Sequence, residues 1–544
     1  MMCWKGTTAM FDILIKNGQI VDGSGTPAFY GDVAIKDGKI VKIAAEISEP
    51  AAEVIDAAGL QVTPGLIDTH SHSDASVYVG NDCYNYLEQG VTTQIAGQCG
   101  SSLAPFHDEL RDKHALTPEK YAIWSEKGKT ATTFMAAAEE ASLGTNVAYF
   151  IGHSAIRAKV MGFSDAAPSP EQLETMKAYV KEAMEAGFLG LSTGLVYAPS
   201  VYATTEEIIE LAKVMVPYGG IYVSHIRGEG RNVLNAVREA IQIGEEGGVP
   251  VFISHLKVMG KQNQGTSKFL LQEIDDAVAR GVTTWADQYP FTASAAPLAS
   301  QIPPKYHVGG YPALLQRLQD PVIRQQILHS IFHESEEFES GILYAGFEGT
   351  LIGKAELTPE YMGKTVSQIA AEEGKKPFDA LCDILIANNA VVGGYYFNQC
   401  VPDMFNIMAH PRVFCGSDTS NYAKRYDHEH VGNGHPRGYA TMVRRLELVR
   451  DYRMRSMEAS IRNVTREPAE ALGLGDHGLL REGWDANVCI MDYERLHATA
   501  DYTHPHRKNI GIHWVLVNGK VAVRDGDAVP GVRNGKTLKR CRKM

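Results

Sequence analysis

Short apolar runs alternate with longer amphipathic stretches through most of the chain. Short apolar runs bounded by turn residues are typical of buried strands, and apolar positions recurring with a helical period are typical of helices. A strand that is regularly followed by a helix indicates parallel βα units. The runs predict eight such strands, at residues 65–68, 92–97, 146–151, 188–192, 220–224, 251–254, 283–287 and 413–417. Eight βα units predict an α/β fold of the TIM (β/α)8-barrel type.

The stretches between these strands carry helix-capping signals. Several begin with Ser, Thr or Pro and end close to Gly, which are the residue types favoured at the two ends of a helix. The clearest predicted helices cover residues 169–187, 204–216, 231–248 and 267–281. Their place between consecutive strands supports the barrel.

Both ends of the chain have the pattern of β-structure. Residues 12–43 alternate apolar and polar positions and are interrupted at Asn17-Gly18 and Asp37-Gly38, two dipeptides that favour hairpin turns. Residues 512–523 repeat the pattern around Asn518-Gly519, and a further strand is predicted at 487–492. We therefore expect a small β domain built from both chain termini, residues 1–63 plus 477–544, beside a barrel at 64–476.

The segment between the last two predicted strands is unusually long. Residues 288–412 span 125 positions, several times what one helix and two loops need. The first part, from Pro290 onward, has no regular periodicity and contains several Pro and Gly residues. We expect a long insertion after strand seven, with residues from about 290 to 350 forming a loop-like cover over the active site.

Composition and charge narrow the function classes. The 544 residues carry 52 Lys and Arg against 64 Asp and Glu, a formal charge of −12, which argues against nucleic acid or an anionic membrane as a partner. We find no apolar stretch long enough for a signal sequence or a membrane span and expect a cytoplasmic protein. The eight Cys residues are scattered without close pairing, which argues against a disulfide framework. Nothing in the pattern indicates an oligomeric state.

Metal-binding side chains cluster where the predicted strands end. In a TIM barrel the active site lies at the carboxyl ends of the strands. All six candidates can bind a metal, and the combination of imidazole with thiolate favours zinc. His70 and His72 follow the first strand, Cys99 the second, His225 the fifth, His255 the sixth and Asp418 the eighth.

A His-x-His triplet by itself is weak evidence for a metal site. With 19 His in the chain, chance alone predicts nearly one such triplet, and residues 428–430 and 504–506 form two more. Taken singly, each candidate is better explained as a core or surface side chain, and Cys in particular is often buried for packing. The placement of all six at strand ends reverses this balance and favours a metal site.

Several longer segments carry a family resemblance. They are PGLIDTHSHSD, GVTTQIAGQCGSSLAP, GHSAIRAKVMG, GFLGLSTGLVYAPS, YVSHIRGEG, FISHLKVMG, DQYPF, FCGSD, HPRGYATMVR and GLLREGWDANVCIMD. In these segments the chain resembles the amidohydrolase superfamily and, within it, the N-acyl-D-amino-acid deacylases. The His-x-His after strand one is shared broadly in that superfamily. A Cys after strand two, where many relatives use a carboxylated Lys, is a narrower feature.

Carried over residue by residue, the resemblance implies two metal positions. A zinc ion with three protein ligands keeps one position open, at which water can be acidified to a pKa of about 7. A nearby carboxylate, here Asp418, would take the proton and pass it to the leaving amine. Cys99, His225 and His255 would hold the tightly bound zinc, and His70, His72 and Asp418 would surround a second, weaker position.

The resemblance also implies residues that bind the substrate. Tyr197 matches the position expected to polarise the scissile carbonyl, and a packed tyrosine at the barrel mouth is the alternative. Lys257, Tyr289 and Arg437 match positions that bind a free α-carboxylate, and a guanidinium suits a planar carboxylate. The segment 421–434 is longer than expected for the family. The resemblance therefore constrains the range of substrates less than it constrains the type of reaction.

The function that the resemblance implies is a zinc-dependent hydrolase acting on a small molecule, an N-acyl-D-amino acid. The segment PFTASAAPLASQ offers no Arg for an acidic substrate side chain, so a small or apolar side chain is expected. Asn487 stands where the family usually has Asp, and no catalytic effect is expected. One alternative is a dipeptidase for peptides with a C-terminal D-residue. A non-catalytic scaffold is disfavoured because all six metal and base positions are intact, and a cyclic-amide hydrolase is disfavoured by Cys99 in place of Lys.

Overall fold

Eight parallel strand positions form the centre of the molecule, as the apolar runs predicted. The computed structural model describes residues 10–78, 81–108, 110, 117–333, 338–421 and 434–541. β8 and β9 are two parts of one strand separated by Phe150, so nine labels fill eight positions. The strands are β6 (Leu66–Asp68), β7 (Val91–Ala96), β8 (Asn146–Tyr149), β9 (Ile151–Gly152), β10 (Gly190–Gly194), β11 (Ile221–His225), β12 (Val251–Ile253), β13 (Thr284–Gln288) and β17 (Val413–Cys415).

The parallel strands close into a barrel. β6, β7 and β8 pair in one sheet, and β9, β10, β11, β12, β13 and β17 pair in another. The β8–β9 strand joins the two sheets on one side. On the other side a bridge links Ser71 to Thr419, and the backbone N–H of Asp418 donates to the carbonyl of His70 at 2.8 Å. The first and last strands therefore end side by side, which brings residues from opposite parts of the chain together.

One barrel strand begins two residues later than the sequence predicted. The prediction was 188–192, whereas β10 pairs with β11 from Gly190 onward. Phe188 belongs to the connection from the preceding helix, which ends at Gly187 with φ of 102°. Leu189 already donates its N–H to the Tyr149 carbonyl at 2.8 Å and accepts from the Ile221 N–H at 3.1 Å, although β10 begins at Gly190. An apolar run marks burial and does not by itself fix where ladder hydrogen bonds begin.

Helices surround the barrel, and the four clearest predictions are confirmed to within two residues at each end. Ser169 caps the first of them by accepting from the Gln172 N–H, and Gly187 ends it in the left-handed conformation. The four are α6 (Pro170–Ala186), α7 (Thr205–Met215), α8 (Val233–Gly247) and α9 (Ser267–Ala279). The other helices are α1 (Tyr84–Leu87), α3 (Pro118–Lys127), α4 (Ala131–Glu140), α5 (His153–Met161), α15 (Val401–Ala409), α16 (Arg437–Asp451), α17 (Met457–Asn463) and α18 (Arg466–Leu472).

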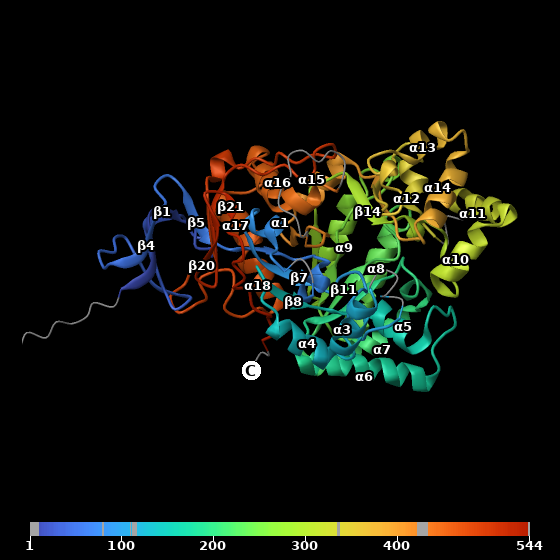
Figure 1. The fold of residues 1–544 in the computed structure, drawn as a ribbon. Coiled ribbons are helices and arrows are strands. Elements are labelled where there is room, and N and C mark those ends of the chain that lie inside the picture. The colour runs from blue at the N-terminus through green and yellow to red at the C-terminus, as the bar shows by residue number, and fades with distance from the viewer. Residues whose placement is uncertain are drawn as a thin grey trace, which may run out of the picture.

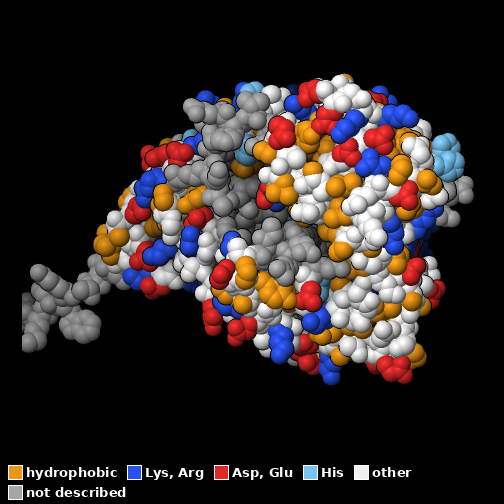
Figure 2. Space-filling model, turned by 45° about the vertical axis from the view of Figure 1, so that its right-hand side comes forward, with side chains coloured by type: hydrophobic (Ala, Val, Ile, Leu, Met, Phe, Trp, Pro, Cys, Tyr) orange, Lys and Arg blue, Asp and Glu red, His pale blue; other side chains and the backbone are white. Residues whose placement is uncertain are grey.

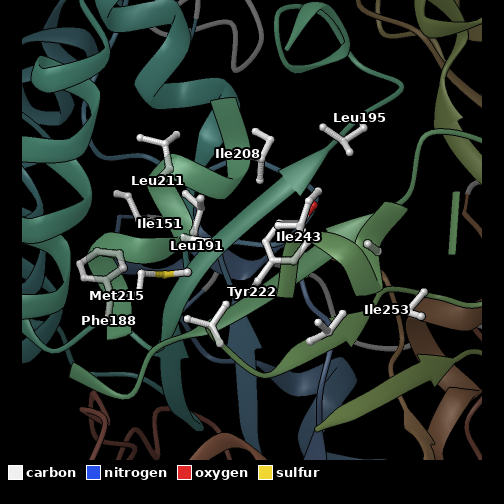
Figure 3. Packing of buried hydrophobic residues seen from close by; sticks show 14 of the residues in the cluster. Ile151, Phe188, Leu191, Leu195, Ile208, Leu211, Met215, Tyr222, Ile243 and Ile253 are labelled. Carbon is white, nitrogen blue, oxygen red and sulfur yellow. The ribbon is translucent and has the colours of Figure 1, made fainter. Parts of the chain in front are cut away.

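Side chains on the barrel strands alternate between two cores. Tyr222 of β11 packs outward against the helices, whereas its neighbours Ile221 and Val223 belong to the cluster inside the barrel. Figure 3 shows the outer layer, in which Leu191 and Tyr222 from the strands lie near Leu211 of α7. This period of two is the expected consequence of strand geometry, and both faces are apolar because helices cover the outside.

The two ends of the chain form one sheet, which confirms the predicted small β domain. In Figure 1 blue strands from the N-terminal part and red strands from the C-terminal part lie side by side at the left of the barrel. β5 pairs antiparallel with β18, which joins the two halves. The boundary residues 63, 64, 476 and 477 stay a prediction. The strands are β1 (Phe11–Ile20), β2 (Phe29–Lys36), β3 (Lys39–Ala44), β4 (Ala51–Asp56), β5 (Gln61–Pro64), β18 (Val488–Met491), β19 (Ile512–Val517), β20 (Lys520–Arg524) and β21 (Asp527–Ala528).

Two of the three predicted hairpin turns are present, and the first is wrong. β2 and β3 meet at Asp37-Gly38, and β19 and β20 meet at Asn518-Gly519. Asn17-Gly18 instead lies inside β1, where the register with β2 shifts and Asn17 has φ of 61°. The side chain of Asn17 donates to Asp56 at 2.9 Å, which holds this bulge in the sheet. A left-handed Asn before Gly serves a bulge as well as a turn, and partners far along the chain decide between them.

The insertion after strand seven is present, but it is a folded unit and not a long loop. Ile331, Leu381 and other apolar residues give it a hydrophobic core of its own. Its antiparallel sheet has the order β14-β16-β15, and β14 lies in the segment expected to be irregular. In Figure 1 the unit occupies the upper right, on the side of the barrel away from the composite sheet. Its elements include β14 (Ala293–Pro297), α10 (Gly310–Leu318), α11 (Pro321–His333), α12 (Gly341–Ala345), β15 (Thr350–Lys354), α13 (Val366–Glu372), α14 (Pro377–Ala387) and β16 (Gly393–Phe397).

A buried ring of asparagines joins the composite sheet to the barrel. The Asn146 side-chain amide donates to Oδ1 of Asn487 at 3.1 Å, and the Asn518 side-chain amide donates to Oδ1 of Asn146 at 2.8 Å. Asn487 closes the ring by donating to Asn518 at 3.2 Å. An amide both donates and accepts, whereas an ionised Asp only accepts, so Asn487 is suited to this ring.

The surface of the described residues is mixed in charge. On the face drawn in Figure 2, basic and acidic side chains are interspersed. Among the helices in the described ranges, none combines the length and the apolar character needed to cross a bilayer.

Candidate active site

The carboxyl ends of the barrel strands bring all six predicted metal-binding side chains together. They form two groups that share Cys99, and within each group the candidate ligand atoms lie within 4.8 Å of one another. Either group could hold a metal ion, because His, Cys and Asp are metal ligands. One group is His70, His72, Cys99 and Asp418, and the other is Cys99, His225 and His255.

The contacts inside the cluster are close. Cys99 Sγ lies 3.4 Å from Nε2 of His70 and 3.4 Å from Nε2 of His255. The rings of His225 and His255 meet edge to face with 4.4 Å between centroids. His225 Nδ1 is buried and has no hydrogen-bond partner among the residues that the structure describes. Nitrogen and sulfur atoms of the candidate ligands thus face one another.

Three of the site residues have a left-handed backbone. Cys99, His255 and Asp418 have φ values of 54°, 35° and 52°. For residues with a side chain this conformation costs on the order of 1–3 kcal/mol and tends to occur at functional sites. Gly97 makes room for the turn before Cys99, since a Cβ there would lie 1.9 Å from the carbonyl oxygen of Phe150. The local sequence therefore aims these side chains inward at a cost in stability.

Cys99 is a thiolate in this environment. Burial alone would raise the pKa of its thiol, but the positive charge of His70 and His255 outweighs burial and holds the pKa well below its usual value. A thiolate is the form in which Cys binds metals. The buried Cys415 gives the contrast, because burial raises its pKa.

Asp287, at the end of β13, supports two of the histidines. Its Oδ2 lies 3.3 Å from His70 Nδ1, and its Oδ1 accepts from the His255 backbone N–H at 2.6 Å. Such a carboxylate orients the imidazole ring and fixes which nitrogen carries the proton. The sequence analysis did not select Asp287, although its place as the last residue of the seventh predicted strand was the available signal. Asp68 ties the first strand to the last, because it accepts from the backbone N–H groups of His70 and Ser417.

Asp418 lies between a histidine and an arginine. Its Oδ1 is 3.0 Å from His72 Nε2, and its Oδ2 is 2.8 Å from the Arg437 guanidinium. Burial would raise the pKa of Asp418, but Arg437 first and then His255, His72 and His70 hold it well below its usual value. Asp418 is therefore a carboxylate. Arg437 also lies 4.9 Å above the Tyr289 ring, so two predicted substrate-binding residues are adjacent.

Lys257 has a partner that the sequence analysis missed. Its Nζ forms a short ion pair with Glu229 and lies 2.6 Å from His255 Nδ1. Glu229 also contacts His255 Nδ1 at 3.1 Å, and Lys257 with neighbouring histidines lowers the pKa of Glu229 despite its burial. Glu229 lies four residues after His225, which was the only signal for it in the sequence.

Tyr197 lies over the metal-binding group formed by Cys99, His225 and His255. Its ring meets that of His225 edge to face with 4.9 Å between centroids, and it lines the same pocket. Gly194 permits this approach, since a Cβ there would lie 2.8 Å from Tyr197 Cδ2. Burial keeps the Tyr197 phenol protonated by raising its pKa well above the usual value. Its O–H is therefore available as a donor.

The site opens into a pocket that the barrel and the insertion line together. The space between atoms measures about 560 Å³, including the part open to solvent. The barrel contributes Tyr197, Lys257 and Tyr289 beside the metal-binding groups. From the insertion come Ser294, Ala295, Ala296, Ser300, Gln301, Phe338, Glu339, Gly341 and Tyr396. The folded insertion thus forms one wall of the pocket, and residues 422–433, within the segment expected to be longer than in the family, lie outside the described residues.

Comparison with known proteins agrees with this arrangement. A model of the amidohydrolase family matches residues 53–523, most of the chain. The chain belongs to the amidohydrolase family. It is 32% identical to a D-aminoacylase of Alcaligenes xylosoxydans xylosoxydans over 97% of this chain and 98% of that protein. It is 30% identical to an N-acyl-D-aspartate deacylase of the same organism, covering 97% and 95% of the two chains.

Among solved structures, an amidohydrolase with a bound ligand is similar throughout. It is an N-acyl-D-glutamate deacylase of Bordetella bronchiseptica complexed with zinc and a phosphonate inhibitor that mimics the tetrahedral intermediate. The TM-score is 0.79 at 29% identity, with 97% of this chain and 100% of that chain covered. Both the barrel and the accessory parts of this protein therefore follow the amidohydrolase pattern.

Proposed function

We propose that the protein is a zinc-dependent hydrolase that cleaves the amide bond of N-acyl-D-amino acids to a D-amino acid and a carboxylate. The observation that carries this proposal is the convergence of two metal-binding groups on Cys99, beside the cations of Lys257 and Arg437. Membership of the amidohydrolase family and the named deacylases support the same reaction class.

The donor set fits zinc. Tetrahedral zinc with Zn–S of about 2.3 Å and Zn–N of about 2.0–2.1 Å separates its sulfur and nitrogen ligands by roughly 3.5 Å. The 3.4 Å between Cys99 Sγ and His255 Nε2 matches that separation, and the unpartnered nitrogen of His225 supplies a third ligand. We assign the tight site to Cys99, His225 and His255, and a second, weaker site to His70, His72 and Asp418. Zinc, when bound, acidifies water and polarises a carbonyl oxygen.

Asp418 serves as the general base and then as the general acid. Its carboxylate is ionised, lines the pocket and lies beside both metal-binding groups. It accepts a proton from the attacking water and delivers it to the leaving nitrogen, a contribution that is typically about 10²–10⁴-fold. The Tyr197 O–H donates to the scissile carbonyl oxygen as negative charge develops there.

The α-carboxylate of the substrate binds to Arg437, Tyr289 and Lys257. Asp418 pairs with one nitrogen of the Arg437 guanidinium. A guanidinium has five N–H donors in all, so others can bind the substrate carboxylate. Glu229 accepts from the Lys257 ammonium, which has three N–H donors, so donors remain for the pocket. With the scissile carbonyl and the carboxylate both fixed, only one configuration at the α-carbon directs the side chain into the pocket. That requirement selects one enantiomer, and the names of the relatives, D-aminoacylase and N-acyl-D-aspartate deacylase, support the D-isomer.

The substrate side chain is neutral. Among the described residues that the insertion contributes to the pocket, none is Lys or Arg. The Glu339 carboxylate, which does line the pocket, accepts from the backbone N–H groups of Gly230 and Asn232, each at 2.8 Å. An acidic substrate side chain would face a carboxylate with no cation opposite, whereas Ala296, Phe338 and Tyr396 provide apolar contact.

The proposal is tested with matched substrates and measured metal content. N-acetyl-D-leucine, N-acetyl-L-leucine, N-acetyl-D-glutamate, the dipeptide Gly-D-Leu and a five-membered cyclic imide are assayed with protein of known zinc content. We expect the highest kcat/KM for N-acetyl-D-leucine. A preference for Gly-D-Leu would indicate the dipeptidase, and a preference for the imide would indicate a cyclic-amide hydrolase. Inactivity on every substrate with zinc bound would overturn the hydrolase proposal.

A further inference from the structure

A buried network of hydrogen-bonded side chains lies behind Tyr197 and plays no part in the chemistry described so far. His153 is the first residue of α5 and is fully buried. Its Nδ1 lies 2.6 Å from Ser200 Oγ, and its Nε2 lies 2.9 Å from the Glu207 carboxylate of α7. Arg157, one turn further along α5, donates to both oxygens of Glu207 at 3.1 and 2.9 Å.

The ion pair with Arg157 fixes the direction of the hydrogen bond at one end of this network. Glu207 is a carboxylate paired with Arg157, so it accepts the proton on His153 Nε2. The other ring nitrogen, Nδ1, shares a hydrogen bond with Ser200 Oγ, and Ser154 Oγ lies 2.7 Å from Ser200 Oγ and forms a hydrogen bond with it. Each hydroxyl and both ring nitrogens of the network thereby have a protein partner.

The arrangement of serine, histidine and carboxylate is one that hydrolases use for nucleophilic attack, but here it cannot reach a substrate. Ser200 and His153 both have 0% exposure. A nucleophile needs an open approach to its oxygen, and the Ser200 oxygen is enclosed by His153 and Ser154. The network therefore has a structural function and no direct contact with a substrate.

The network holds the turn that carries Tyr197. Ser200 begins a short helical turn three residues after Tyr197, and the Val201 N–H donates to the Tyr197 carbonyl at 2.9 Å. Arg227 fastens the far side of the same segment by donating to the carbonyls of Val201 and Ala203, each at 3.0 Å. These hydrogen bonds fix the backbone next to Tyr197, and the Tyr197 ring must stay against His225.

We propose that His153, acting through Ser200, is a positioning residue that holds Tyr197 over the metal site. The inference rests on the donor function proposed for Tyr197. A displacement of about 1 Å in a catalytic group can cost 10²-fold in rate, so the loss of this fastening should appear in kcat.

A double-mutant cycle of His153→Gln and Tyr197→Phe tests the inference. Loss of one oxyanion donor costs about 10²–10³-fold, which is the loss expected in kcat for Tyr197→Phe. His153→Gln should lower kcat by about 10- to 100-fold with little change in KM or zinc content. The double variant should lose no more than Tyr197→Phe alone, because its Tyr197 hydroxyl is already absent. Independent, multiplying losses would overturn the inference.

Two further variants guard against a general folding defect. Ser200→Ala removes the same hydrogen bond while leaving His153 and Glu207 paired, so a smaller loss coupled to Tyr197 is expected. His477→Gln is the matched control, since His477 is also buried, hydrogen-bonds a backbone carbonyl and does not line the pocket. It should leave kcat unchanged, and a loss there equal to that of His153→Gln would overturn the inference.

A crystal structure of His153→Gln supplies a readout that does not depend on activity. The Tyr197 ring should leave its 4.9 Å edge contact with His225, and an unmoved ring would contradict the inference. A fully active Tyr197→Phe would refute the donor function of Tyr197 and the inference with it, while N-acyl-D-amino-acid hydrolysis by the wild type would still stand. Absence of that hydrolysis would instead refute the proposed function.

Discussion

Replacing Arg437 by Ala tests two functions that the proposal gives to one side chain. Arg437 pairs with Asp418 at 2.8 Å, and both side chains are more than nine-tenths buried. The proposal also gives Arg437 the α-carboxylate of the substrate. The variant therefore loses a contact with the substrate and, at the same time, a cation beside the general base.

The size of the first effect follows from hydrogen-bond energetics. A hydrogen bond to a charged group contributes about 1.5–3 kcal/mol, which corresponds to about a 10- to 150-fold loss of kcat/KM for an N-acyl-D-amino acid. The second effect appears in the pH profile. Arg437 depresses the pKa of Asp418, so its removal raises that pKa, and the acid limb of kcat/KM moves to higher pH.

The assay compares N-acetyl-D-leucine with its amide, N-acetyl-D-leucinamide, from about pH 3 to about pH 9, because the acid limb follows the low pKa of Asp418. The acid should lose activity through both effects, whereas the amide should show only the shifted pH limb, because its carboxylate contact is already missing. Arg450→Ala is the control on the same helix, as Arg450 pairs with Asp451 and contacts the Tyr493 carbonyl. Equal losses for acid and amide at every pH would refute carboxylate recognition by Arg437.

Three other changes test separate parts of the account. Asp418→Asn should retain tightly bound zinc yet lose about 10²–10⁴-fold in kcat, and a loss below ten-fold would remove Asp418 as the proton carrier. Ala296→Arg places a cation in the pocket wall and should raise the kcat/KM ratio of N-acetyl-D-glutamate to N-acetyl-D-leucine at least ten-fold over the neutral control Ala296→Gln; an unchanged ratio would show that this wall does not meet the side chain. Asn146→Ala breaks the ring that joins the composite sheet to the barrel and should lower the free energy of unfolding, measured by urea, by about 1–3 kcal/mol with kcat unchanged. A change in kcat with no change in stability would contradict a structural function for Asn146.

The sequence predicted the barrel and the gathering of the six candidate ligands because both follow from local signals. Apolar runs locate strands, and a parallel barrel places the residues after those strands at one face, so His70 and Asp418 meet although they are far apart in the chain. The helix ends were equally local, as Ser169 and Gly187 show.

Long-range partners account for what the sequence did not predict. Asn17-Gly18 forms a bulge because β1 continues against distant strands, and β14 is a strand only because β16, about a hundred residues later, pairs with it. Glu229 and Asp287 became visible only when the fold placed them against His255 and His70. Their places, at the end of a strand and four residues after a candidate ligand, do not by themselves distinguish them from ordinary acidic side chains.

The most direct test of the central claim is a zinc titration coupled to a stereochemical assay. Chelator-treated protein is loaded with increasing zinc, and the hydrolysis of N-acetyl-D-leucine and N-acetyl-L-leucine is followed at each step, with Cys99→Ala in parallel. The account predicts that activity on the D-isomer rises to its maximum near one zinc per chain, that the L-isomer stays unreactive, and that Cys99→Ala neither retains zinc nor gains activity. Full activity of metal-free protein, or equal rates for the two isomers, would contradict it.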